Sequence, residues 1–244
     1  MKQFLKVLSQ KWPEYLLEIL VLIIGIYGAF ALESWNDRRN QQAEERIFLT
    51  NVYENLRIDS VQFVYYEKQY QMIETLHVQL YQIGIKNEQV DSLIDPLMIR
   101  RSLYFKQLVD TDLADRAQTL LNTQIKQELI DYGKRVVDLE DVYKGQLEGI
   151  ILETRAYLSQ HRVYNTDRWF EVKNKVAKGY TFDEFDGQNI VDKDLLIALS
   201  KTKEFQQRLF ELNLKWNEFY SRLTIIMEAR NQLQDLLEQE LFKK

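Results

Sequence analysis

The sequence predicts an all-α protein in which an N-terminal transmembrane helix continues into an extracytoplasmic antiparallel bundle of about four helices. Three observations support this prediction: 8 Gly and 2 Pro in 244 residues, one long apolar run, and apolar residues at helical spacing after it. A sandwich or barrel needs a turn signal roughly every 8–12 residues, which so few Gly and Pro cannot supply. The absence of Cys excludes a disulfide scaffold and a Cys-ligated zinc or iron–sulfur site.

The apolar run covers residues 19–32 and is flanked by Trp12 and Trp35. A helix between these two Trp residues would be roughly 35 Å long, which fits a hydrocarbon layer of about 30 Å with an aromatic anchor at each interface. The sequence therefore predicts three parts: a short N-terminal tail over 1–14, a transmembrane helix over 15–35 and a helical bundle over 36–244.

Two other interpretations of the run stay open. Ala29 and Ala31 form an A-x-A pattern, so the segment could be a signal peptide cleaved after Ala31, although Glu14 and Glu18 are unusual before such a run. The run could also be a buried helix of a soluble core. Nothing later in the chain is apolar enough to enclose it.

The charges that flank the run are nearly balanced. Three lysines precede it and three arginines follow it, so the positive-inside rule gives little preference. Acids after the run and the N-terminal amine before it favour a cytoplasmic N-terminus. We therefore expect a single-pass protein of the cell inner membrane with the bulk of the chain in the periplasm. The flanking charges are Lys2, Lys6 and Lys11 before the run, and Arg38, Arg39, Arg46, Asp37, Glu44 and Glu45 after it.

One face of the predicted span is acidic at one end and small in the middle, with Glu33 at its lower edge. At about 100° per residue it contains Glu18, Leu22, Gly25, Ala29 and Glu33. Gly25 and Ala29 would let a second helix approach closely, and an intramembrane carboxyl normally faces a protein neighbour. The face predicts packing against another copy or another membrane protein. Alternatively, Glu18 reaches the lipid headgroups or takes part in a proton or ion path.

The chain beyond Trp35 predicts a first helix that continues to Gly84, where Gly before a polar stretch is typical of a helix end. Its apolar stripe has one polar interruption, Asp59, and is of the width found in bundles. The stripe comprises Leu49, Val52, Leu56, Asp59, Phe63, Tyr66, Tyr70, Ile73, Leu76, Leu80 and Ile83.

Three further helical stretches are expected. The first begins with Asp95 as cap and Pro96 in the first turn, and the second begins after Thr111 and Asp112 and continues to Leu158. The last covers about 193–242, and 161–192 is expected to be a long loop. The apolar faces of the last two stretches are expected to include Leu121 and Leu195 among others.

The long loop carries aromatic side chains without clear periodicity, and we regard them as a candidate partner-binding loop. The alternative is that these side chains pack onto the bundle core. They are Trp169, Phe170, Tyr180, Phe182 and Phe185.

The opening of the chain resembles a known family. The resemblance rests on the run Glu18–Val21, on Gly25 and Ile26, on the exit Trp35–Arg39, and on the later stretch ADRAQTLLNTQIKQELIDYGKR. These patterns look like an uncharacterised Bacteroidota family of single-pass membrane proteins that carries a domain of unknown function. The resemblance implies an anchored helical protein and adds no chemistry.

Signals for catalysis or nucleic-acid binding are weak. The only histidines are His77 and His161, and no known nucleophile, metal or phosphate-loop motif is present. We interpret His77 as packed or solvated. A net charge of -5 gives no overall basic field, so no nucleic-acid partner is expected.

These observations predict a non-enzymatic envelope protein without cofactor or metal, whose partners are the lipid bilayer and another copy or another membrane protein. Assembly is expected through the transmembrane face and the bundle. The alternative is an extracytoplasmic sensory or ligand-binding module that needs a separate signalling partner.

Overall fold

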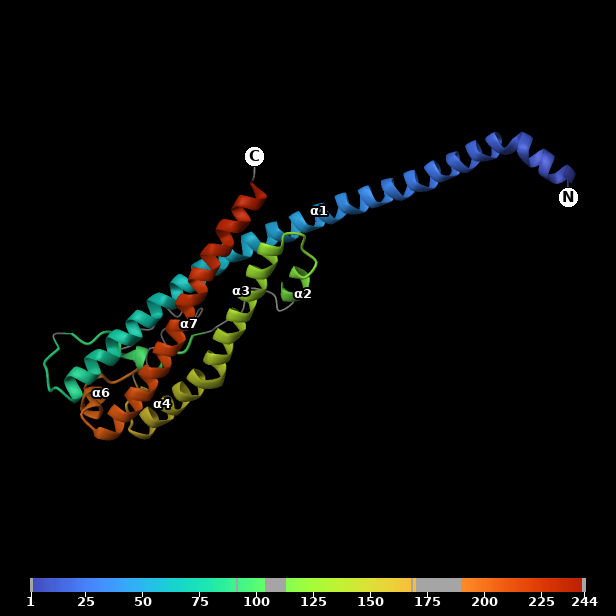
Figure 1. Cartoon of the computed structure of the whole chain (residues 1–244). Helices are drawn as coiled ribbons and strands as arrows, with labels where there is room; N and C mark the ends of the chain where they lie inside the picture. The colour runs from blue at the N-terminus through green and yellow to red at the C-terminus, as the bar shows by residue number, and fades with distance from the viewer. Residues whose placement is uncertain (1, 91, 104–112, 168, 170–189, 243–244) are drawn as a thin grey trace. The chain divides into compact units, whose positions relative to one another are not determined.

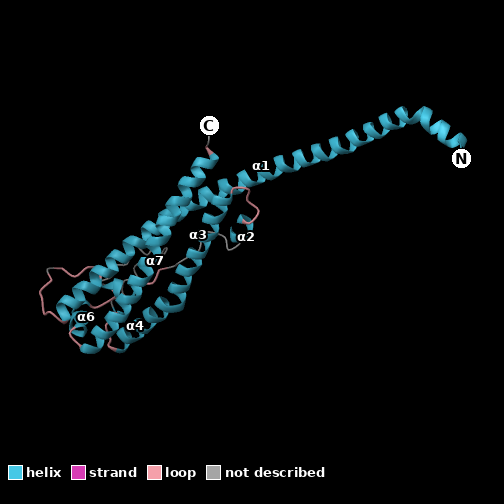
Figure 2. Ribbon diagram, viewed as in Figure 1, coloured by secondary structure: helices cyan, strands magenta, loops and turns pink. Residues whose placement is uncertain are grey.

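The computed structural model describes residues 2–90, 92–103, 113–167, 169 and 190–242. Regular secondary structure in this part of the chain is helical, which confirms the all-α prediction (Figure 2). A single antiparallel β-bridge between Tyr164 and Val191 is the exception. The chain falls into two compact units, residues 1–51 and 52–244.

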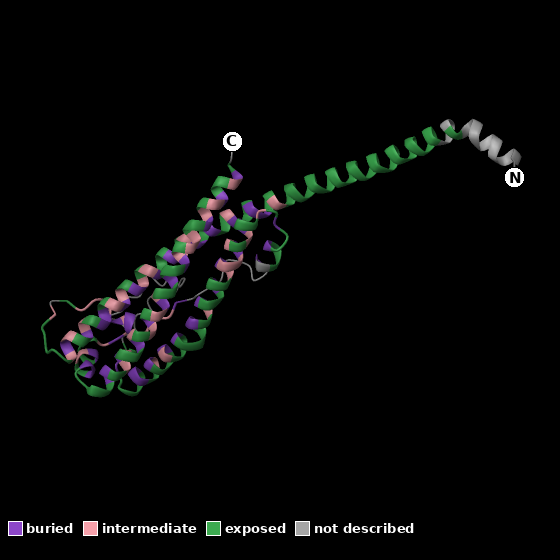
Figure 3. Cartoon of the chain, viewed as in Figure 1, coloured by how far each residue is buried: buried purple, intermediate pink, exposed green. Residues whose placement is uncertain are grey.

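The first unit contributes the N-terminal part of α1, a helix with the bounds Lys2–Gly84. Every described side chain from Leu16 to Glu44 is exposed, including the whole apolar run (Figure 3). Within the described residues, α1 is the one helix that is long and apolar enough to cross a membrane, judged by length and composition.

The second unit contains the rest of α1 and all later elements (Figure 1). These elements are η1 (Pro96–Arg100), α2 (Leu113–Ala117), α3 (Thr123–Val142), η2 (Tyr143–Leu147), α4 (Glu148–Gln160), α6 (Lys193–Ser200) and α7 (Lys203–Leu241). Of these, η1 is a 3₁₀ helix and η2 is a short π-helix between α3 and α4.

In this unit α1 and α7 run in opposite directions. Near one end, Nη1 of Arg230 donates to the carbonyl oxygen of Leu56 at 3.3 Å. Near the other end, Nε2 of Gln206 donates to the carbonyl oxygen of Leu80 at 3.1 Å. The residue number rises along α1 while it falls along α7, so the two helices are antiparallel.

The core of the second unit lies where the apolar stripe of α1 meets the apolar face of α7. Every position of the expected stripe that belongs to this unit is buried, from Val52 to Ile83; Leu49, in the first unit, is buried as well. On α7, Trp216 and Phe219 are almost completely buried and pack edge to face, with ring centroids 5.8 Å apart. Phe219 also packs against Tyr143 of η2, with ring centroids 5.7 Å apart. Helix α7 therefore contacts both α1 and the π-helix that links α3 to α4.

Asp59, the polar residue that interrupts the stripe, has a hydrogen-bond partner inside the core. Asp59 is 3% exposed, and its Oδ2 accepts a hydrogen bond from the hydroxyl of Tyr132 on α3 at 3.2 Å. Burial raises the pKa of Asp59 to about 6, although the Tyr132 hydrogen bond and the charge of Arg230 act in the opposite direction.

Two helices expected to be continuous are divided, and the side chains at the breaks explain why. Asn122 caps α3 by accepting from the backbone N–H groups of Gln124 and Ile125, so the stretch after α2 starts a new helix. Thr202 similarly caps α7, which separates it from α6. Two residues expected on apolar faces are exposed instead, Leu121 at 55% and Leu195 at 46%.

Other expected boundaries agree with the structure. α1 ends at Gly84, where an added Cβ would lie 2.2 Å from the carbonyl oxygen of Ser200, so only Gly fits. Asp95 caps η1 and Pro96 lies in its first turn, although this helix is a short 3₁₀ helix. Thr111 and Asp112 lie outside the described residues.

The expected long loop begins and ends as predicted, because α4 ends at Gln160 and α6 begins at Lys193. The described parts of its two ends are joined by backbone hydrogen bonds. Asn165 N–H donates to Ile190 O at 2.9 Å, and Asp192 N–H donates to Val163 O at 2.8 Å.

Candidate functional site

The predicted transmembrane face lies on α1 within the first unit. Glu18, Leu22, Gly25, Ala29 and Glu33 are all exposed. A Cβ added at Gly25 would meet no atom within 4 Å, so the surface there is open to close approach by another helix. The role of this face stays a prediction.

The two predicted interface anchors are also exposed, Trp12 at 58% and Trp35 at 61%. The guanidinium carbon of Arg39 lies 5.7 Å from the ring centroid of Trp35. An aromatic ring beside a cationic side chain suits the level of the headgroups, where both groups keep a polar contact.

A cavity of about 910 Å³ lies within the second unit. We call it the arginine cavity, because Arg100, Arg101 and Arg155 line it. Its walls come from η1 and the residues after it, from η2 and α4, and from the described ends of the long loop. Aromatic and hydroxyl groups complete its lining: Tyr143, Tyr164, Trp169, Ser102 and Thr166.

Arg155 of α4 holds the segment after η1 in place. Its Nε and Nη2 donate to the carbonyl oxygen of Arg100 at 3.0 and 2.8 Å, and Nη2 also donates to Ser102 Oγ at 2.7 Å. The π-helix η2 supplies a second hydrogen bond to this segment, since the Tyr143 hydroxyl donates to the carbonyl oxygen of Leu103. Short π-helical segments within α-helices often occur at functional sites, and Tyr143 lines this cavity.

The other two arginines are positioned by tyrosine side chains. The guanidinium of Arg100 lies 4.8 Å from the ring centroid of Tyr164, a cation–π geometry. Tyr164 is itself fixed, because its hydroxyl donates to the carbonyl oxygen of Arg155 at 3.2 Å. Arg101 donates from Nη2 to the hydroxyl of Tyr65 at 2.7 Å, while its buried Nε has no hydrogen-bond partner in the described part of the chain.

The charges of the cavity are not balanced. Three arginines against Glu148 leave a formal charge of +2 on its described lining, and none of the three arginines forms an ion pair with a described acidic residue. Burial and the nearby charge of Arg100 lower the pKa of Arg155. Burial also raises the pKa of Tyr143 to about 12, so this ring stays neutral and adds no balancing charge.

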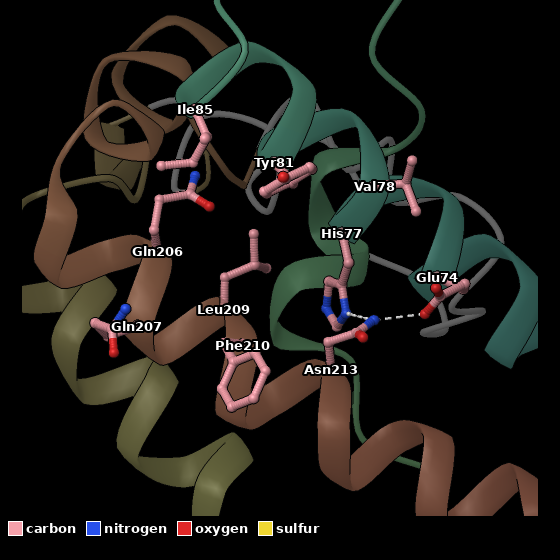
Figure 4. Close-up of a pocket in the computed structure, with 10 residues that line it drawn as sticks. All are labelled: Glu74, His77, Val78, Tyr81, Ile85, Gln206, Gln207, Leu209, Phe210 and Asn213. Carbon is pink, nitrogen blue, oxygen red and sulfur yellow. Dashed lines mark hydrogen bonds between the residues drawn. The ribbon is translucent and has the colours of Figure 1, made fainter.

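A second cavity, of about 550 Å³, lies between α1 and α7 (Figure 4). His77 borders it and is 2% exposed, and burial lowers its pKa to about 3, so the imidazole is neutral at physiological pH. Its apolar wall includes Leu209 and Phe210.

The hydrogen bonds around His77 fix its tautomer. Asn213 Oδ1 accepts from Asn217 Nδ2 at 3.0 Å, so Asn213 Nδ2 points the other way, toward Glu74 Oε2 at 2.5 Å and His77 Nδ1 at 3.2 Å (Figure 4). His77 Nδ1 is then an acceptor and Nε2 carries the proton. His77 is therefore a residue of the core, and its buried Nε2 has no hydrogen-bond partner among the described residues.

Comparisons with protein-family models, with curated proteins and with solved structures found no match to this chain. Among the described residues, no group of three or more His, Asp or Glu side chains is placed to hold a metal ion. The chemistry of the site therefore rests on its own geometry.

The arginine cavity includes one residue of the predicted partner-binding loop. Trp169 is half-buried and lines the cavity, and its backbone N–H donates to Asn165 O at 3.1 Å. The other four loop aromatics, Phe170, Tyr180, Phe182 and Phe185, lie outside the described residues.

Sequence reasoning did not select the three arginines of the cavity. Arg100 is the last residue of a short helix and Arg101 follows it, whereas Arg155 lies more than fifty positions further along the chain. No motif or periodicity connects them, so only the folded chain brings them together. The adjacent pair Arg100 and Arg101 was the one local signal available.

Proposed function

We propose that this chain is a non-enzymatic, single-pass membrane protein that assembles with a second copy or with another envelope protein. In this proposal the N-terminal segment is the membrane anchor, and an antiparallel bundle of about four helices lies in the periplasm. The observation that carries the proposal is the full exposure of the apolar run of α1 within its own unit. Such a surface requires an apolar environment that this unit does not provide.

The transmembrane face supports assembly over simple anchoring. A span that only contacts lipid needs no small residues, whereas Gly25 has open space around it and Ala29 lies on the same face. Glu18 belongs to this face as well, and a carboxyl in or near the hydrocarbon layer is stabilised by a protein donor. A neighbouring helix would satisfy both features at once.

Matched leucine substitutions test the proposal. Ala29→Leu and Gly25→Leu add bulk to the proposed face, while Ala31→Leu makes the same change about 200° away around the helix. We expect the first two variants to lower the yield of crosslinked complex several-fold in native membranes, and Ala31→Leu to leave it unchanged. Glu18→Leu should act like Gly25→Leu.

The complex itself is measured by native mass after gentle extraction. A mass that is a multiple of 29.3 kDa indicates self-assembly, and a mass explained by one copy plus another protein identifies a hetero-complex. A bare monomer, together with equal crosslinking yields in all four variants, would contradict the proposal.

A second candidate function is a sensory or ligand-binding module that works with a separate signalling partner. The observation that favours it is the arginine cavity, since concave sites of roughly 300–1,000 Å³ with a few polar groups are typical of ligand binding.

A further inference from the structure

We infer that the arginine cavity binds a small organic oxyanion with a planar apolar body, and that Arg100 makes the direct contact with the negative group. This inference rests on the second candidate function and is independent of assembly through the transmembrane helix. It begins from the cavity itself, whose volume of about 910 Å³ suits a ligand larger than a simple ion.

The charge of the cavity selects for an anion. Three guanidinium groups line one space, and none forms an ion pair with a described acidic residue. Cations gathered in a partly desolvated space repel one another, and the pKa of Arg155 is lowered by burial first and by the charge of Arg100 second. A bound oxyanion would remove this penalty and gain charge-assisted hydrogen bonds.

The existing hydrogen bonds show which arginine is available to a ligand. The Nε and Nη2 donors of Arg155 already form hydrogen bonds to Arg100 O and Ser102 Oγ, and Arg101 donates to the hydroxyl of Tyr65. These two arginines hold the walls. Arg100 makes a face contact with Tyr164 and, among the described residues, has no hydrogen-bond acceptor for its guanidinium.

The geometry around Arg100 suits a two-point contact. A guanidinium that lies over a ring keeps its planar edge of N–H donors free, and that edge matches the two oxygens of a carboxylate or phosphate. Arg155 helps from behind, because its bonds to the carbonyl of Arg100 fix the backbone from which this side chain extends. The site is therefore preorganised before the ligand arrives.

The aromatic lining defines the rest of the ligand. Tyr143, Tyr164 and Trp169 border the same space. Aromatic faces pack favourably against planar apolar groups, at about 0.5–1.5 kcal/mol for each ring pair beyond the burial of area. A carboxylate or phosphate on an aromatic or similarly flat body fits both parts of the cavity.

Calorimetric titration of the full-length protein in detergent tests the inference with defined probes. The probes are 2-naphthoate, 1-naphthyl phosphate, inorganic phosphate and the neutral isostere 2-naphthamide. We expect 2-naphthoate or 1-naphthyl phosphate to bind, and 2-naphthamide and inorganic phosphate to bind at least about tenfold more weakly, since each lacks one half of the contact. The tighter of the two naphthyl anions identifies the head group.

Variants of equal charge change locate the site. Arg100→Gln should weaken the better naphthyl anion by about tenfold or more, whereas Arg135→Gln on the exposed surface of α3 should leave binding unchanged. Should Arg100→Gln fail to fold, Arg100→Lys keeps the charge without the planar fork and should still weaken binding.

Two results would overturn the inference. One is the absence of binding of every anionic probe at millimolar concentration, and the other is binding that Arg100→Gln and Arg100→Lys leave unchanged. Binding is measured on the protein alone, so a missing signalling partner cannot produce either result.

Discussion

The two parts of α1 distribute their apolar side chains differently. In residues 19–32 apolar side chains are exposed on every side, for example Ile24 at 62% and Tyr27 at 72%. In residues 52–84 the buried apolar side chains lie on one side of the helix and exposed ones on the other, so Leu56 is fully buried while Val61 is 71% exposed. An apolar surface all around a helix indicates a solvent that is itself apolar, whereas a stripe indicates a protein neighbour on one side.

The acidic residues of α1 show the same contrast. Asp59 replaces an apolar residue in the stripe and finds its hydrogen-bond donor, Tyr132, within the same chain. Glu18 interrupts the apolar surface near the start of the span, and its exposed carboxylate has no donor among the described side chains. The first acid is a feature of the fold, whereas the second would need a headgroup or another protein if the proposed membrane span is correct.

The largest expected effect comes from placing charge in the first region. Ile24→Arg combined with Tyr27→Arg should move most of the protein out of the carbonate-resistant membrane fraction, because each Arg near the centre of a span costs about 2.5–3.5 kcal/mol. Ile58→Arg combined with Val61→Arg repeats the change at the same spacing on exposed positions of the second region. Equal membrane fractions for the two double variants would show that the two regions of α1 do not differ in their surroundings.

A smaller effect is expected at the buried acid. Burial raises the pKa of Asp59 to about 6, so between pH 3.8 and about 6 the folded protein holds a proton that the unfolded chain releases. Stability from this group is therefore present at low pH and lost as the pH rises through 6. Asp59→Asn removes the charge, and we expect it to raise the free energy of unfolding at pH 8 by at most about 3 kcal/mol.

Chemical denaturation of the full-length protein at pH 4.5 and pH 8 measures this effect. The gain from Asp59→Asn should be smaller at the lower pH, where the native carboxyl is protonated, and should vanish only below about pH 3.8, where the unfolded chain is protonated as well. Asp138→Asn, an exposed position on α3, serves as the control and should change neither value. A gain that is equal at both pH values would show that charge is not the cause.

Much of the fold could be predicted from local patterns. The stripe of α1 was predicted position by position because a helix that packs on one side repeats its apolar residues every three to four positions. The end at Gly84 follows from a residue type that favours helix ends, and the limits of the long loop follow from the break in helical periodicity between 161 and 192.

The breaks within the later helices could not be predicted in the same way. Apolar spacing continues across Asn122 and Thr202, and only the cap hydrogen bonds of these side chains show that new helices begin there. Leu121 and Leu195 were placed on apolar faces for the same reason and are exposed.

The candidate site was the least predictable part of the molecule. Arg100, Tyr143, Arg155 and Tyr164 come from segments that are distant in sequence, and each one alone reads as an ordinary surface or core residue. Only Trp169 belonged to a set selected from the sequence. A cavity formed by the packing of several segments has no periodic signal.

Labelling of single introduced cysteines tests whether a membrane surrounds the apolar run of α1. The chain has no Cys of its own that would react. Ile24→Cys and Val61→Cys are compared in opened native membrane vesicles with a membrane-impermeant maleimide. We expect rapid labelling of Val61→Cys, and labelling of Ile24→Cys only after denaturation in SDS. Equally rapid labelling of both positions before denaturation would contradict this expectation, since these side chains are similarly exposed in the protein and only a surrounding bilayer would distinguish them.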